Sequence, residues 1–170
     1  MAKAKKAAAK KSRKAAIKRT AKAVALAKTS AAPAYTVHTA KEITATFDDR
    51  IGLTAKVAAA VAAENVNILA ATGYSASGFR DKATFTLIVD DLVKAEKALD
   101  RIGALEIHES SVLMVETPNK PGSLERIAKV IAEAGINIYY FYATTSSGKT
   151  ATSVIKTADD KMALKVLRNA

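Results

Sequence analysis

The fold of this chain is decided by residues 119–138, which read NKPGSLERIAKVIAEAGINI. Pro121 and Gly122 are typical of a tight turn, and apolar residues then recur at helical spacing from Leu124 to Ile131. Gly135 suits the left-handed residue that ends many helices. The stretch therefore predicts a turn, a helix of about three turns and the start of a strand.

The same pattern occurs 70 residues earlier, where residues 49–68 read DRIGLTAKVAAAVAAENVNI. The shift brings Gly52 onto Gly122 and Asn67 onto Asn137, and after a gap of two residues the later parts of the two copies align as well. Matches over such a length indicate an internal duplication.

Each copy predicts a strand, a helix, two strands joined by a hairpin, and a second helix. In the first copy the hairpin contains Gly78, the second helix covers residues 92–102, and a fourth strand covers residues 104–110. In the second copy the hairpin contains Gly148 and the second helix covers residues 159–167. The order βαββαβ predicts an α+β fold, with two ferredoxin-like modules in tandem and both helices of each module on one face of an antiparallel sheet.

The second copy lacks its last strand, because the chain stops at Ala170, where the counterpart of residues 105–110 would begin. In the ferredoxin-like strand order 4-1-3-2, the missing strand lies beside the first strand of its module. Residues 111–116 are therefore expected to be covered by the continuing strand of the first copy, by a partner chain, or by nothing.

The positive charge is concentrated near the start of the chain. The sequence has 27 basic and 16 acidic residues, and residues 1–30 contain eleven of the basic residues and none of the acidic ones. Such a Lys/Ala-rich segment buries little apolar surface, so it is expected to be disordered when free and to bind DNA, RNA or another polyanion. Its composition resembles the tails of linker histones, although an unselected, solubilising extension is the alternative. The residues expected to contact nucleic acid are Lys5, Lys6, Lys10, Lys11, Arg13, Lys14, Lys18 and Arg19.

These observations divide the chain into three parts. Residues 1–34 form the basic tail and its linker, residues 35–110 the first module, and residues 111–170 the second module.

The composition argues against catalysis and against a metal or cofactor. The chain has no cysteine, which excludes disulfides, thiolate metal sites and cysteine nucleophiles. His38 and His108 have no ligand at metal-binding spacing. Residues 143–150 approximate a phosphate-binding loop, but strand-like sequence follows them where a helix is required. The longest apolar run, residues 57–63, is too short to cross a bilayer, so we expect a cytoplasmic protein without a membrane partner.

Residues 119–124, the following helix and residues 134–138 resemble the ACT domain, a small ligand-sensing module of amino-acid metabolism. The first copy resembles it more weakly, because Ile51 replaces the proline. Two such modules without a catalytic domain resemble the tandem ACT proteins of bacteria. The resemblance implies a non-catalytic regulatory homodimer that binds a small amino acid at domain interfaces. The ligand-binding residues it implies are Asn119, Lys120, Pro121, Gly122, Ser123, Leu124, Asn137 and Ile138 in the second copy, and Asp49, Gly52 and Asn67 in the first.

The residues give this resemblance a physical basis. The Pro-Gly turn exposes a helix N-terminus, whose free N–H groups suit a carboxylate. Asn119 and Asn137 offer both a donor and an acceptor to a zwitterion, although each can instead serve only the local backbone. We expect the main site in the second copy, because Asp49 of the first copy would repel a carboxylate.

Three alternatives remain open at this stage. The protein is an amino-acid sensor, a nucleic-acid-associated protein whose ACT repeats serve as a dimerisation scaffold, or a structural subunit that escorts an enzyme. The aromatic run at residues 139–142 predicts that the sheet face without helices is covered, either by another domain or chain or by the other copy of the same chain.

Overall fold

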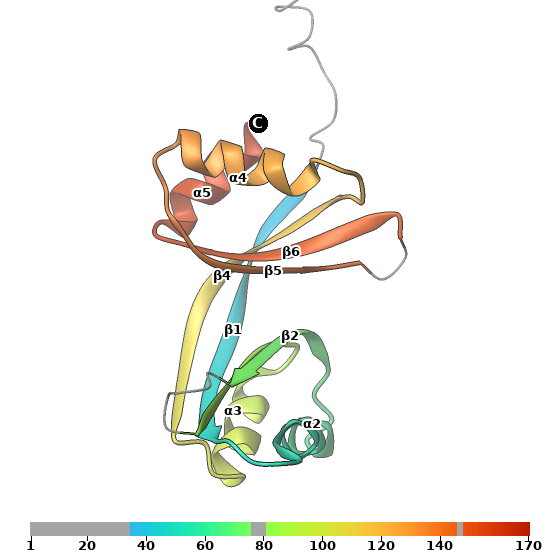
Figure 1. The fold of residues 1–170 in the computed structure, drawn as a ribbon, viewed down its shortest axis with the longest axis vertical. Coiled ribbons are helices and arrows are strands. Elements are labelled where there is room, and N and C mark those ends of the chain that lie inside the picture. Colours follow the sequence, from blue (N-terminus) through green and yellow to red (C-terminus); the bar gives the residue numbers. More distant parts are fainter. Residues whose placement is uncertain (1–34, 76–80, 146–147) are drawn as a thin grey trace, which may run out of the picture. The chain divides into compact units, whose positions relative to one another are not determined.

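The computed structural model describes residues 35–75, 81–145 and 148–170 (Figure 1). The predicted basic tail and Gly78 lie outside the described residues. The elements are β1 (Thr36–Asp48), α2 (Leu53–Ala63), β2 (Ile68–Ser75), β3 (Lys82–Val89), α3 (Leu92–Arg101), β4 (Glu106–Pro118), α4 (Ser123–Glu133), β5 (Ile138–Thr144), β6 (Thr150–Thr157) and α5 (Asp160–Arg168).

The strands form one antiparallel sheet in the order β2-β3-β1-β4-β6-β5. β1 and β4 have 13 residues each, and they pair with each other over Thr36–Thr46 and Glu106–Glu116. Each long strand therefore belongs to both modules. The first module is β2-β3-β1-β4 and the second is β1-β4-β6-β5, so both have the predicted order 4-1-3-2 (Figure 1).

The first half of β1 takes the place of the strand that the second copy lacks. Thr36–Lys41 pairs with Ser111–Glu116 of β4, and the other edge of β4 pairs with β6 from Leu113 onward. Of the three arrangements expected for residues 111–116, cover by a strand of the first copy is confirmed. This edge needs no partner chain.

Two cores lie between the sheet and its helices. Val57 and Val61 of α2 are buried in the first core, and Ile127 and Ile131, their counterparts in α4, are buried in the second. The left-handed residue predicted after the first helix of the second copy is confirmed at Gly135, whose φ is 72°.

The short second helices begin with capping aspartates. The Asp91 carboxylate accepts a hydrogen bond of 3.1 Å from the backbone N–H of Lys94 in α3. The Asp159 carboxylate accepts one of 2.9 Å from the N–H of Met162 in α5. Both contacts satisfy N–H groups that the helix leaves free.

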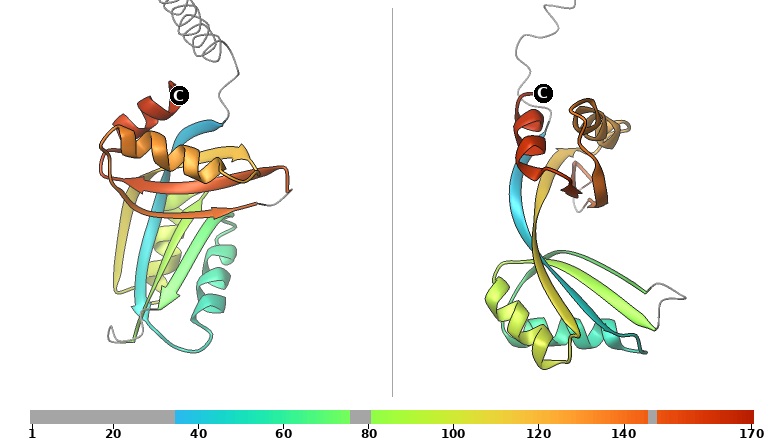
Figure 2. Two further views of the ribbon diagram at one scale, coloured as in Figure 1. Left: turned by 45° about the horizontal axis from the view of Figure 1, so that its top comes forward. Right: turned by 90° about the vertical axis from the view of Figure 1, so that its left-hand side faces the viewer.

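The sheet face without helices is buried in part within the same chain, and Figure 2 shows the helices of both modules on the other face of the sheet. Ile88 of β3, Val112 of β4 and Val154 of β6 form a third buried cluster there, and Tyr142 of β5 packs against it. The cover expected for the aromatic run is therefore present within the chain only at Tyr142, since Tyr140 is 39% and Phe141 52% exposed. Tyr139, beside a bulge in β5, is 62% exposed.

Candidate functional site

The turn before α4 is built from local hydrogen bonds. Gly122 has a φ of 84°, which favours glycine because side chains with a Cβ avoid this region. The Ser123 hydroxyl donates to the carbonyl of Pro118 at 2.7 Å, and the Asn119 amide donates to the carbonyl of Gly148 at 3.2 Å. No side chain caps α4, so its positive end is open to an anion.

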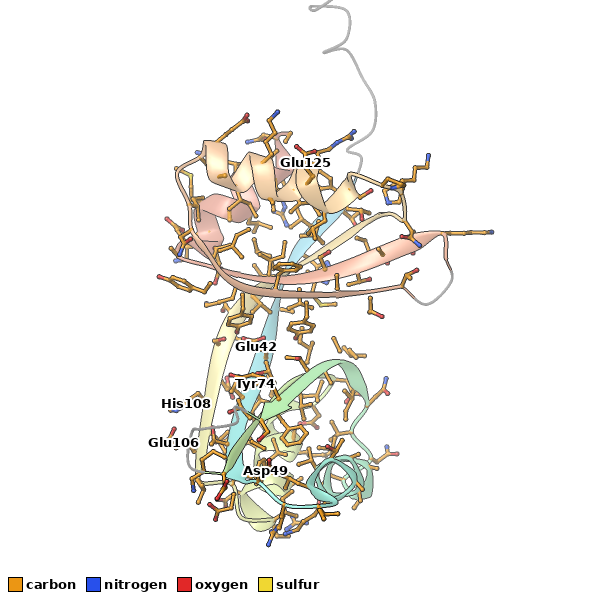
Figure 3. All side chains as sticks on the ribbon, viewed as in Figure 1. Glu42, Asp49, Tyr74, Glu106, His108 and Glu125 are labelled. Atoms are coloured by element: carbon orange, nitrogen blue, oxygen red, sulfur yellow. The ribbon has the colours of Figure 1, made fainter. Side chains whose placement is uncertain are left out.

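A cavity of about 400 Å³ lies against this turn, and we call it the second-module cavity. It is lined by the positive residues Lys120 and Arg126 and by the negative residue Glu125, which Figure 3 labels on α4. The other residues that line it are Tyr35, Thr117, Pro118, Pro121, Gly122 and Ser123.

Tyr35, which lines this cavity, has a buried hydroxyl. The residue is 6% exposed, and its hydroxyl has no hydrogen-bond partner among the described residues. Burial raises the pKa of Tyr35, while the positive charge of Arg126 acts in the opposite direction. The hydroxyl therefore stays protonated at neutral pH.

The first module has an equivalent cavity of about 370 Å³ at the N-terminus of α2, which also lacks a side-chain cap. Arg50 supplies a positive charge there, and the Asp49 carboxylate accepts a hydrogen bond of 2.5 Å from the Ser75 hydroxyl (Figure 3). A Cβ at Gly73 would lie 3.0 Å from the Phe85 ring. The lining residues of this first-module cavity are Asp49, Arg50, Gly52, Leu53, Thr54, Ala71, Thr72, Gly73, Tyr74, Ser75, Ala83 and Phe85.

The structure brings together some of the expected ligand-binding residues. Lys120, Pro121, Gly122 and Ser123 line the second-module cavity, and Asp49 and Gly52 line the first-module cavity. Leu124 and Ile138 lie instead in a separate apolar groove between α4 and β5.

The asparagines at the strand starts lie away from the turns. Asn137 follows the C-terminus of α4, an 11-residue helix that spans about 16 Å, and its carbonyl accepts a hydrogen bond from the N–H of Ala158. In the first module the N–H of Asn67 donates to the Asp90 carboxylate at 2.9 Å. A small ligand bound at the turn of one module therefore cannot also contact the asparagine at the start of that module's second strand.

Sequence reasoning missed Tyr35, Arg50 and Arg126 as cavity residues. Arg126 could have been found, because it lies four residues after Gly122 and so one helical turn above it. Tyr35 was harder to find. It and Val37 start an alternation of apolar and polar residues, but the polar residues Thr39 and Lys41 interrupt this alternation before the strand predicted for the first copy begins.

The described residues contain no group of three or more His, Asp or Glu side chains that could hold a metal ion. None of their helices combines the length and the apolar character that a membrane span requires.

Comparison with known proteins finds similarity in structure rather than in sequence. Neither the scan against protein-family models nor the search of curated proteins gives a match. Among solved structures, protein BT0572 from Bacteroides thetaiotaomicron is 25% identical with a TM-score of 0.70, and the match covers 78% of this chain and 89% of that one. The regulatory subunit of aspartate kinase from Thermus thermophilus is 18% identical with a TM-score of 0.58, covering 80% and 95%.

These matches agree with the strand order and the duplication. The chain has the tandem ACT fold. Clostridium acetobutylicum aspartate kinase also contains it, at 14% identity and a TM-score of 0.56, where the match covers 79% of this chain and 34% of the kinase. The tandem ACT fold thus occurs both in separate regulatory subunits and as part of an enzyme, and it confirms the fold expected from residues 119–138.

Proposed function

We propose that this protein is a non-catalytic regulatory protein of the cytoplasm that binds a small amino acid or a related metabolite. One observation carries the proposal. Each module has a cavity at the open N-terminus of its first helix, and each cavity contains side chains of both charges. A zwitterion requires this combination, because its carboxylate and its ammonium group need partners of opposite sign.

The second-module cavity is the main site in this proposal. The α-carboxylate would lie at the N-terminus of α4 between Lys120 and Arg126, and the ammonium group would face Glu125. Two positive residues line this cavity, whereas Arg50 is the single positive residue among the described residues that line the first-module cavity. Pro121 also fixes the backbone of the turn that aims the helix.

A homodimer would complete the site. Asn137 is separated from the turn of its own module by the length of α4, so it can contact a ligand at that turn only if a second copy supplies it. Leu124 and Phe141 leave apolar surface exposed at the α4–β5 edge, which suits such an interface. Ligand binding would then change association, provided that the two association states differ in affinity for the ligand.

A thermal-shift screen of the twenty amino acids against the full chain tests the proposal. A ligand at about 100 times its dissociation constant should add about 2.7 kcal/mol to the free energy of unfolding. Calorimetry then tests the site, since Asn137→Ala should weaken binding at least tenfold, or about 1.4 kcal/mol, and Asn67→Ala much less. Equal losses would show that both modules bind, and no loss with Asn137→Ala would contradict a ligand role for this residue. Sedimentation that shows only a monomer with bound ligand would contradict the dimer.

A second function is favoured by the charge distribution, since residues 1–30 carry eleven basic and no acidic residues. In this alternative the tail binds nucleic acid and the ACT repeats form a dimerisation scaffold. Retention on duplex DNA should then be lost in a chain that starts at Ala34. The logarithm of the binding constant should fall with the logarithm of the salt concentration, with a slope of about 0.9 per neutralised phosphate. Equal retention of both chains would rule the alternative out.

A further inference from the structure

A further cavity lies on the sheet face without helices, between the edge strands β2 and β5. Its volume is about 450 Å³, and we call it the β2–β5 cavity. It is distinct from the cavities at the helix N-termini, because all of its described lining residues belong to strands. These residues are Leu69, Ala70, Ala71, Thr72, Met114, Glu116, Tyr142, Ala143, Thr144, Thr150, Thr152 and Val154.

A polar row crosses the part of this cavity that the second module supplies. Glu116 of β4 pairs with Thr152 of β6, and Thr152 pairs in turn with Thr144 of β5. Side chains at paired positions lie on the same face of a sheet, with Cβ atoms about 4.5–5.5 Å apart. One carboxylate and two hydroxyls therefore lie next to one another along the row.

An apolar row lies beside the polar row, two residues away along each strand. Met114 pairs with Val154, and Val154 pairs with Tyr142. Met114 and Tyr142 are half-buried and pack against the third buried cluster, and Leu69 of β2 lines the same cavity from the first module. At about 3.4 Å per residue, the two rows are about 7 Å apart. The cavity therefore has a polar end and an apolar end.

Glu116 supplies the charge of the β2–β5 cavity. It is the single charged residue among the described residues that line the cavity. The residue is exposed, so a ligand can reach its carboxylate, and it forms no ion pair with another described residue. Because the attraction between opposite charges is stronger beside protein than in bulk water, this carboxylate favours a cation as the ligand.

We propose that the β2–β5 cavity binds a short alkylamine in its ammonium form. The ammonium group lies at the polar row, where Glu116 neutralises its charge and the hydroxyl oxygens of Thr144 and Thr152 accept hydrogen bonds from it. The alkyl part extends along the strands to Met114 and the ring of Tyr142. The apolar row favours an organic cation over an inorganic one, because a bare ion would leave this row in contact with water.

The same lining selects against an amino acid. Its described residues offer no basic side chain and no helix N-terminus to a carboxylate, so the carboxylate of a zwitterion would lose water without gaining a partner. This site therefore differs in chemistry from the cavities at α2 and α4, and it does not depend on the function proposed for them.

NMR titration of the isotope-labelled full chain tests the proposal, with n-butylammonium chloride as the probe at pH 7 and constant ionic strength. We expect saturable shifts of the backbone amides of Met114, Glu116, Thr144 and Thr152. The affinity should rise about threefold from n-propylammonium to n-butylammonium, because one more methylene group is largely buried. n-Butanol, γ-aminobutyrate and potassium chloride serve as a neutral analogue, a zwitterion and an inorganic cation, and each should bind at least about fivefold more weakly.

Two variants locate the site. Glu116→Gln should weaken n-butylammonium binding about fivefold, the upper end for an ion pair that water can reach, because it keeps the shape of the side chain and removes its charge. Glu106→Gln, at an exposed carboxylate on the same strand and outside the cavity, should change the affinity less than twofold. The absence of saturable shifts, shifts centred on other residues, equal losses in the two variants, or a control compound that binds as tightly as n-butylammonium would each overturn the proposal.

Discussion

Replacing Tyr35, Tyr140 or Tyr139 by phenylalanine removes one hydroxyl from three different environments. The Tyr140 hydroxyl donates to the buried Glu42 carboxylate. The Tyr35 hydroxyl is buried and has no partner among the described residues. Tyr139 is 62% exposed, so water surrounds its side chain. We expect the free energy of unfolding to fall in Tyr140→Phe, to rise in Tyr35→Phe and to stay unchanged in Tyr139→Phe.

The structure sets the size of each effect. A hydrogen bond to a charged group contributes about 1.5–3 kcal/mol, and Tyr140 is 39% exposed, so its loss should cost about 1.5 kcal/mol, the lower end of this range. An unsatisfied buried polar group costs about 1–3 kcal/mol, so Tyr35→Phe should stabilise the protein by about 1 kcal/mol. The exposed control, Tyr139→Phe, should remain within about 0.5 kcal/mol of the parent.

Urea unfolding at pH 7 measures all three variants, and an unchanged dependence on urea concentration shows that they unfold in the same way as the parent. The reasoning is refuted if Tyr35→Phe destabilises the protein as much as Tyr140→Phe, since the Tyr35 hydroxyl would then have a partner. A loss below about 0.5 kcal/mol in Tyr140→Phe would show that its bond to Glu42 contributes nothing to stability.

Three further predictions concern the charge of Asp160, the turn before α4 and the shared strand. Burial raises the pKa of Asp160, but hydrogen bonds from Lys156 and Thr157 outweigh it and hold the pKa below its usual value. Asp160→Asn should therefore cost about 1–2 kcal/mol at pH 7, and urea unfolding should show this difference shrinking as the pH falls below about 4. Gly122→Ala should cost about 1–2 kcal/mol in the same assay because of the positive φ, and Gly122→Asn less, whereas equal losses would contradict a backbone cause. A chain that starts at Glu42 leaves one edge of β4 open and should form larger assemblies in sedimentation than the full chain does.

The sequence was sufficient to predict the duplication, the order of the elements and the strand order within each module. These features depend on short-range signals, such as the spacing of apolar residues in α4 and the glycines that adopt positive φ at Gly122 and Gly135. Because these signals occur twice in one chain, each copy supports the interpretation of the other.

The sequence was insufficient where a residue serves both modules. Thr39 and Lys41 are exposed because the helices of neither module cover this part of β1, so the alternation that marks a strand is interrupted there. The bond between Glu42 and Tyr140 joins residues 98 positions apart, and no local pattern encodes it. Tyr35 was missed for the same reason, because the cavity it lines is formed only after β1 has paired with β4.

The sharing of β1 has a consequence for synthesis on the ribosome. Thr36 pairs with Glu116, 80 residues later in the chain. At about 5–20 residues per second, the first half of β1 waits about 4–16 s until its partner has been made. During that time the rest of the first module is made, while the first half of β1 has no strand partner. The order of synthesis thus delays the pairing of the first half of β1 in the second module's sheet until the first module has been made.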